Sequence, residues 1–259
     1  AANVAIAKSK ENKTFFIYSL KGVNYMKKVF CFLLCLLTMF TTSFNVSGVD
    51  RLVKEEEGIV VNNSAVQSPS AENLPIEIHA KSAVLMEVSS GEVLLQYNAD
   101  EKLFPASVTK IMTMLLVAEA IDENKITLAD KVVCSTNAAS KGGSQIWLEE
   151  GEEMTVDELL RATAIGSAND AATLLGEYVA GSEQGFIDMM NSRAKELGMN
   201  NTNFENATGL DDTTDTHLTT ARDIGIMSVE LLKHDFITDY TTVWMDSLRN
   251  GETELVNTN

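Results

Sequence analysis

Cysteine and histidine are scarce in this chain of 259 residues, and their positions exclude two kinds of site. Of three cysteines, Cys31 and Cys35 share one apolar run near the N-terminus, which leaves Cys134 alone in the remainder. A single cysteine cannot form an internal disulfide, so we expect Cys134 to act as a small buried hydrophobe. The three histidines show no metal-ligand spacing, and the sequence predicts neither a metal nor another cofactor. They are His79, His217 and His234.

Basic residues are also few. The chain has 20 Lys and Arg against 37 Asp and Glu, which gives a formal net charge of -17. Such a balance argues against nucleic acid as a partner and favours a soluble, acidic protein. The length suits one sizeable domain or two small ones.

The longest apolar run, residues 29–40, is shorter than the roughly 20 residues that a membrane span needs. It follows Met26-Lys27-Lys28 and precedes a polar stretch of small residues, so we interpret residues 26–48 as a signal peptide for export. Residues 1–25 would then be an upstream extension outside the native protein. Residues 49–74 lack periodicity and read as a flexible linker, and residues 75–259 form the folded domain.

Strands are predicted first and helices after them. The apolar runs 83–88 and 93–97 flank Gly91 and predict a β-hairpin. A largely apolar helix follows Pro105 and ends near residues 122–124. Thr155 and Glu158 form a capping box at the start of another helix. Further helices are expected at residues 171–179, 183–197 and 220–232. This order disfavours a simple alternating parallel fold.

Ser107 and Lys110 are three residues apart at the start of the apolar helix. At that spacing a lysine amine can reach the serine hydroxyl, and partial burial would lower the lysine pKa toward the value that a general base needs. The local alternative is a helix-capping serine beside an exposed lysine. A second pair with the same spacing, Ser192 and Lys195, lies on a mixed polar face and reads as solvated surface.

Residues 104–113 resemble the nucleophile helix of the penicillin-binding serine peptidases, specifically the low-molecular-mass D-alanyl-D-alanine carboxypeptidases. Residues 165–172 resemble the second motif of that family, Ser-x-Asn followed by Asp-Ala-Ala. In order and spacing the resemblance runs from about residue 75 to the last residue. Shorter similar stretches occur at residues 143–148, 197–202, 206–210 and 219–223.

The resemblance implies an α/β (α+β) protein with the β-lactamase/penicillin-binding transpeptidase-like fold, in which the hairpin belongs to the catalytic sheet beside a mainly helical subdomain. It implies that Ser107 is the nucleophile, that Lys110 accepts its proton, and that Ser167 relays a proton to the leaving amine. Asn169 would hydrogen-bond Lys110 and the substrate amide. The implied substrate is a peptidoglycan stem peptide ending in D-Ala-D-Ala, with β-lactams as covalent inhibitors. The implied location is the cell envelope outside the cytoplasm, either the periplasm or the outer face of the cytoplasmic membrane.

One family feature is missing from the sequence. The third motif, Lys-Thr-Gly or Lys-Ser-Gly on a strand of the catalytic sheet, occurs nowhere in the chain. We interpret the sequence as a C-terminally truncated reading frame that lacks sheet strands, and we expect this fragment to be inactive by itself. Membrane association is expected only through the signal segment or a C-terminal anchor.

Two alternatives stay open at this point. A class A β-lactamase shares the fold and the first motif, but such enzymes favour Asp where Ala168 stands and carry a Glu-x-x-Leu-Asn segment that this chain lacks. A non-catalytic cell-wall binding homologue could have kept the scaffold and lost the third motif. The coding sequence beyond Asn259 would separate the second alternative from an enzyme.

Overall fold

The computed structural model describes residues 2–8, 14–20, 78, 80–210 and 215–257, and all of these belong to one compact unit formed by residues 1–21 and 69–259. The predicted signal peptide and the whole of the predicted linker fall outside the described residues, as does His79. Those assignments therefore stay predictions.

The predicted hairpin is confirmed. Strands β3 (Ala83–Glu87) and β4 (Val93–Tyr97) pair antiparallel, with a register shift between Leu85 and Met86. Gly91 has φ +70°, a conformation that glycine adopts without a steric penalty. The turn is closed by Glu87, whose carboxylate accepts hydrogen bonds from the Ser89 and Ser90 hydroxyls. These bonds lower the pKa of Glu87 to about 2.

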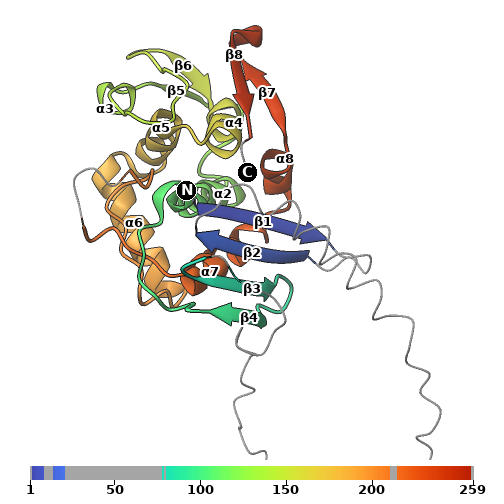
Figure 1. The fold of residues 1–259 in the computed structure, drawn as a ribbon. Helices are drawn as coiled ribbons and strands as arrows, with labels where there is room; N and C mark the ends of the chain where they lie inside the picture. Colours follow the sequence, from blue (N-terminus) through green and yellow to red (C-terminus); the bar gives the residue numbers. More distant parts are fainter. Residues whose placement is uncertain (1, 9–13, 21–77, 79, 211–214, 258–259) are drawn as a thin grey trace, which may run out of the picture. The chain divides into compact units, whose positions relative to one another are not determined.

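The hairpin lies in a four-stranded antiparallel sheet of order β1-β2-β3-β4 (Figure 1). Strand β2 (Thr14–Leu20) pairs with β3, and β1 (Ala2–Lys8) pairs with β2. Strand β2 thus covers an edge of β3 that would otherwise present unpaired backbone groups. Their origin outside the native protein stays a prediction.

Helix α2 (Lys110–Asp122) is the centre of the core. Nine of its 13 residues are buried, which fits a helix that is apolar on all sides. It packs against α4, α5, α6 and α7, and α7 also covers β2 and β3. The other helices are α3 (Thr136–Ala139), α4 (Val156–Gly166), α5 (Asn169–Ala180), α6 (Glu183–Glu196), α7 (Ala221–Leu231) and α8 (Thr238–Thr241), with short 3-10 turns η3 (Ala106–Thr109), η4 (Asp235–Ile237) and η5 (Arg249–Gly251).

The helices predicted from local signals are found within a few residues of their expected bounds. Thr155 caps α4, because its hydroxyl accepts a hydrogen bond from the Glu158 N–H (3.2 Å). The Glu158 carboxylate in return accepts from the Thr155 N–H (2.9 Å). Both bonds of the predicted capping box are therefore present.

Two small antiparallel sheets were not predicted. Strands β5 (Lys131–Val133) and β6 (Glu153–Thr155) form one, and β7 (Met245–Leu248) and β8 (Thr253–Val256) form the other. Each strand has three or four residues, too few for an alternating pattern to stand out. The β7–β8 hairpin packs on α4.

Cys134 is buried, as predicted, with 2% of its surface exposed. Burial raises the pKa of its thiol to about 11, so the thiol stays protonated at neutral pH. Within the described ranges, none of the helices is both long and apolar enough to span a bilayer.

Candidate active site

Ser107 and Lys110 meet at a change of helix type. The sequence predicted that Ser107 lies in the first turn of an α-helix, but it lies in the 3-10 turn η3, and α2 begins at Lys110. Side chains three residues apart eclipse one another in a 3-10 turn. The Lys110 amine consequently lies 3.3 Å from the Ser107 hydroxyl oxygen.

The two groups differ in their access to water. Ser107 is exposed, whereas only 3% of Lys110 is exposed. Burial lowers the pKa of Lys110 from 10.5 to about 7, and the negative charge of Asp170 partly opposes this change. Much of Lys110 is therefore a neutral amine near pH 7, positioned beneath a hydroxyl that a substrate can reach. A hydroxyl and a neutral amine in contact can act chemically as a nucleophile and its base.

A turn from a distant part of the sequence completes the surroundings of Lys110. The Lys110 Nζ donates a hydrogen bond to the Thr208 carbonyl (2.9 Å), and the Thr113 hydroxyl donates to the Ala207 carbonyl (2.7 Å). Sequence reasoning did not assign these contacts. Asn206, three residues before Gly209, predicts a turn in the sequence. That pattern does not indicate which part of the protein the turn contacts.

The second motif joins α4 to α5. Ser167 ends α4 in a left-handed conformation with φ +54°, and Asn169 begins α5. The Asn169 backbone N–H donates to the Ser144 carbonyl and its side-chain amide donates to the Gly142 carbonyl, both at 2.7 Å. In the described part of the chain the structure does not bring the Asn169 amide to Lys110, which bonds Ser107 and Thr208 instead. The predicted bond from Asn169 to Lys110 and the predicted relay by Ser167 stay untested.

Asp170 is a further residue of the site to which the sequence analysis gave no role. Its carboxylate is 1% exposed and accepts backbone hydrogen bonds from Ile146 (3.1 Å), Leu148 (3.0 Å) and Ala171 (2.9 Å). Together with Asn169 it fixes residues 142–148 against the start of α5. Its negative charge also favours the charged form of Lys110, so one buried carboxylate affects both the loop and the Lys110 amine.

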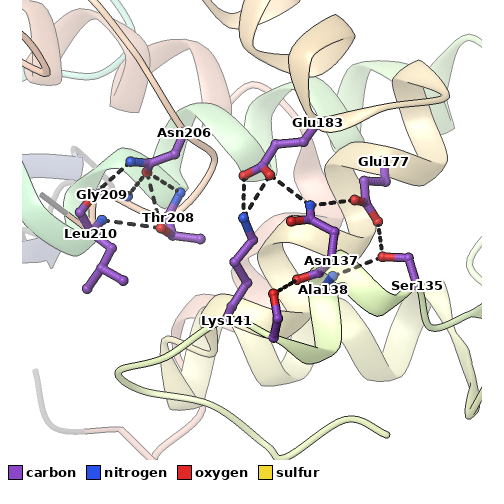
Figure 2. Close-up of polar contacts among 11 residues, drawn as sticks. Ser135, Asn137, Ala138, Lys141, Glu177, Glu183, Asn206, Thr208, Gly209 and Leu210 are labelled. Atoms are coloured by element: carbon purple, nitrogen blue, oxygen red, sulfur yellow. Dashed lines mark hydrogen bonds and ion pairs between the residues drawn. The ribbon is translucent and has the colours of Figure 1, made fainter. Parts of the chain in front are cut away.

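A polar network holds the chain just before this loop. Lys141 forms an ion pair with Glu183 (2.7 Å), and the Asn137 amide donates to Glu177 and to Glu183 (Figure 2). The Ser135 hydroxyl also donates to Glu177 (2.5 Å). These contacts connect α3 and the segment leading to Gly142 with helices α5 and α6. They explain how an irregular loop keeps a defined position.

Replacing Asp170 with asparagine is expected to reduce the free energy of unfolding by about 2–4 kcal/mol. The substituted amide would turn an N–H₂ group toward backbone N–H donors, leaving at least one buried donor without an acceptor. Urea unfolding checks this value. Asp130→Asn is the control, because Asp130 also accepts a backbone N–H (from Thr127) but is far less buried. Equal losses in both variants would contradict the claim that the buried hydrogen bonds of Asp170 stabilise the protein.

The second serine–lysine pair lies where the sequence analysis placed it. Ser192 and Lys195 are exposed on α6, so nothing lowers the hydration of that lysine. The interpretation of this pair as solvated surface is confirmed.

Comparison with known proteins places this geometry in a family. The family model for D-alanyl-D-alanine carboxypeptidases, peptidase family S11, matches residues 65–259. The chain belongs to this family. The match includes the Ser107–Lys110 turn, the Ser167–Asn169 motif and the turn at residues 206–210. The resemblance inferred from the motifs is therefore confirmed.

Relatives within the carboxypeptidase family are similar over most of the described region. D-alanyl-D-alanine carboxypeptidase DacF from Bacillus subtilis is 53% identical over 183 residues, covering 70% of this chain and 46% of the relative. DacC from Escherichia coli is 41% identical over 169 residues, covering 63% of this chain and 42% of the relative. This chain thus spans about half the length of the curated relatives that it matches.

Solved structures confirm the predicted fold. Penicillin-binding protein 6B from Escherichia coli superposes with a TM-score of 0.68 at 33% identity, covering 75% of this chain and 61% of that chain. Penicillin-binding protein D2 from Listeria monocytogenes, in its ampicillin-bound form, superposes with a TM-score of 0.61 at 31% identity. The match covers 69% of this chain and 72% of that chain. The chain therefore has the β-lactamase-like fold of penicillin-binding proteins, and neither sequence-based alternative is favoured.

Proposed function

We propose that the protein is a serine D-Ala-D-Ala carboxypeptidase that removes the terminal D-alanine from peptidoglycan stem peptides. The observation that carries the proposal is the 3.3 Å contact between the buried Lys110 amine and the exposed Ser107 hydroxyl, in a chain of this family. Because the substrate lies in the cell wall, the protein would act outside the cytoplasm, in the envelope.

The reaction begins when the neutral Lys110 amine takes the proton of Ser107. The serine oxygen attacks the carbonyl carbon of the penultimate D-alanine and forms a tetrahedral oxyanion, for which the Ser107 N–H is one donor. The peptide C–N bond then breaks, and the leaving amine receives a proton through Ser167. D-alanine departs and an ester on Ser107 remains.

Water completes the cycle. Lys110, neutral again, removes a proton from a water molecule, which attacks the ester carbonyl. The ester C–O bond breaks, the proton passes from Lys110 to the Ser107 oxygen, and the shortened stem peptide is released as a carboxylic acid. Asn169 would orient the substrate amide during both steps. A β-lactam enters the same path when its ring amide takes the place of the peptide bond, and the resulting ester persists. Binding of ampicillin by the Listeria monocytogenes relative supports this part of the proposal.

Labelling with a fluorescent penicillin tests the proposal on the protein expressed from its complete reading frame. We expect covalent labelling of the wild type, no labelling of Ser107→Ala, and full labelling of Ser192→Ala, the matched control from the exposed pair. We expect the wild type and Ser192→Ala to release D-alanine from a pentapeptide, and Ser107→Ala not to release it. If wild type and Ser107→Ala label equally, Ser107 is not the nucleophile.

A further inference from the structure

The turn at residues 206–210 is organised by one side chain. The Asn206 side-chain oxygen accepts hydrogen bonds from the backbone N–H groups of Thr208 (3.0 Å) and Gly209 (2.7 Å), and from the Thr208 hydroxyl (3.1 Å). Its amide nitrogen donates to the Leu210 carbonyl (2.7 Å), as Figure 2 shows. An asparagine that bonds the backbone two and three residues ahead fixes the shape of a turn. The conformation of this turn therefore depends on Asn206.

Two consecutive carbonyl groups of this turn accept hydrogen bonds from α2. The Thr208 carbonyl accepts from the Lys110 amine (2.9 Å), and the preceding carbonyl, that of Ala207, accepts from the Thr113 hydroxyl (2.7 Å). Lys110 and Thr113 lie one turn apart on α2. The spacing of the two carbonyls thus matches the spacing of the two donors, and a change in the turn would move both contacts.

The contact with Thr208 has a consequence for proton transfer. A neutral amine has two N–H bonds and one lone pair, and a carbonyl oxygen can only accept a hydrogen bond. Donation to Thr208 occupies one N–H of Lys110 and limits the rotation of the amine. The lone pair can then point at the Ser107 hydroxyl, 3.3 Å away. Proton transfer depends steeply on such alignment.

We propose that Asn206 is a positioning residue for acylation, which holds the Thr208 carbonyl against Lys110 and thereby orients the amine toward Ser107. This inference rests on the proposed function, in which Lys110 takes the serine proton. Asn206 acts through Thr208 and not on the substrate.

The experiment compares Asn206→Ala, Asn206→Asp and a matched control in the protein expressed from its complete reading frame. Asn191→Ala is the control, because Asn191 also braces this connection through two bonds, to the N–H (2.9 Å) and the carbonyl (2.8 Å) of Phe204. It does so two residues upstream, with no bond to residues 206–210 in the described part of the chain. The rate constant for acylation by a fluorescent penicillin is measured from pH 5 to 9, together with thermal unfolding.

Asn206→Ala is expected to lower the second-order acylation rate constant by about 10–100-fold, the effect of a misaligned catalytic group. Asn191→Ala is expected to lower the unfolding temperature about as much as Asn206→Ala does, while its acylation rate stays close to that of the wild type. Asn206→Asp should regain part of the rate, because a carboxylate accepts the same backbone N–H groups but cannot donate to the Leu210 carbonyl. Its rate should also rise at higher pH than in the wild type, because the added negative charge favours the Lys110 ammonium.

Three outcomes separate this inference from the proposed function. If both alanine variants lose rate in proportion to stability, or if Asn206→Ala keeps the wild-type rate, Asn206 is not a positioning residue. If the wild type itself is not acylated, the proposed function fails, and the titration of Lys110 then decides the inference. This titration is followed by NMR of ¹³C-labelled lysine, and the Lys110 signal is assigned with Lys110→Met. The pH midpoint of the Lys110 titration should rise in Asn206→Asp and stay unchanged in Asn191→Ala. A midpoint equal in all three proteins would overturn the inference.

Discussion

Lys110→Met is expected to make the protein more stable at neutral pH while it abolishes acylation. Lys110 is 3% exposed, and burial lowers its pKa from 10.5 to about 7. One pKa unit corresponds to about 1.4 kcal/mol, so keeping this lysine in the core costs roughly 4–5 kcal/mol at low pH. Methionine removes that cost, but it leaves the Thr208 carbonyl without its donor, which costs about 1–3 kcal/mol. The net gain at pH 7 is expected to be about 2 kcal/mol.

The pH dependence of this gain follows from the direction of the shift. Between about pH 7 and 10.5 the unfolded chain binds the lysine proton and the folded protein does not. The stability of the wild type therefore rises with pH across that window, relative to Lys110→Met. The advantage of Lys110→Met should be largest below pH 7, and above pH 10.5 it should reverse, because only the cost of the unpaired Thr208 carbonyl then remains. Urea unfolding at several pH values measures it.

Lys195→Met is the matched control for this prediction. Lys195 is exposed on α6, so its substitution should change neither the stability nor the acylation rate appreciably. If Lys110→Met is less stable than wild type at every pH, the lysine is not a desolvated base. A gain in stability together with lost acylation would instead show that the site keeps a destabilising residue for its chemistry.

Gly209→Ala is expected to cause a large loss of stability next to the Ser107–Lys110 turn. Gly209 has φ +80°, and an added Cβ would lie 1.7 Å from the Ala106 carbonyl oxygen and 2.7 Å from the Thr109 hydroxyl oxygen. The left-handed conformation costs a non-glycine residue about 1–2 kcal/mol, and relieving the overlap by backbone movement costs about 1–3 kcal/mol more. We expect a total loss of about 2–5 kcal/mol. Acylation should fall as well, because the movement separates Thr208 from Lys110.

Gly198→Ala isolates the effect of the contact. Gly198 also has a positive φ, +76°, but a Cβ added to it would meet no atom of the described residues within 4 Å. This control carries only the conformational cost, about 1–2 kcal/mol. Urea unfolding of the two variants gives the difference. Equal losses would mean that the close approach of Gly209 to Ala106 and Thr109 is not maintained in solution.

Local signals in the sequence predicted the elements that depend on neighbours in the chain. The capping box at Thr155, the hairpin around Gly91 and the helical spacing after Pro105 each involve residues within a few positions of one another. The type of turn at Ser107 was wrong, because a 3-10 turn and an α-helical turn share the same residue pattern over four positions. The pairing of Ser107 with Lys110 does not depend on that distinction.

The contacts that complete the site could not be predicted from patterns of neighbouring residues in the sequence. Lys110 and the Thr208 carbonyl are 98 residues apart in sequence, and Asn169 and the Gly142 carbonyl are 27 apart. Both acceptors are backbone carbonyls, which every residue carries, so residue identity gives no signal for them. The buried carboxylate of Asp170 was visible only as part of a motif. Its role became clear from the backbone N–H groups that it binds.

Peptide mapping of a β-lactam adduct tests the central claim most directly. Trypsin should separate the two serine–lysine pairs, because cleavage after Lys102 and Lys110 releases residues 103–110, and cleavage after Arg161 and Arg193 releases residues 162–193. We predict that the adduct mass appears on the peptide with Ser107, and that its rate of formation rises with pH through about 7, where Lys110 loses its proton. An adduct on residues 162–193, or a rate independent of pH between 5 and 9, would contradict the assignment of Ser107 and Lys110 as nucleophile and base.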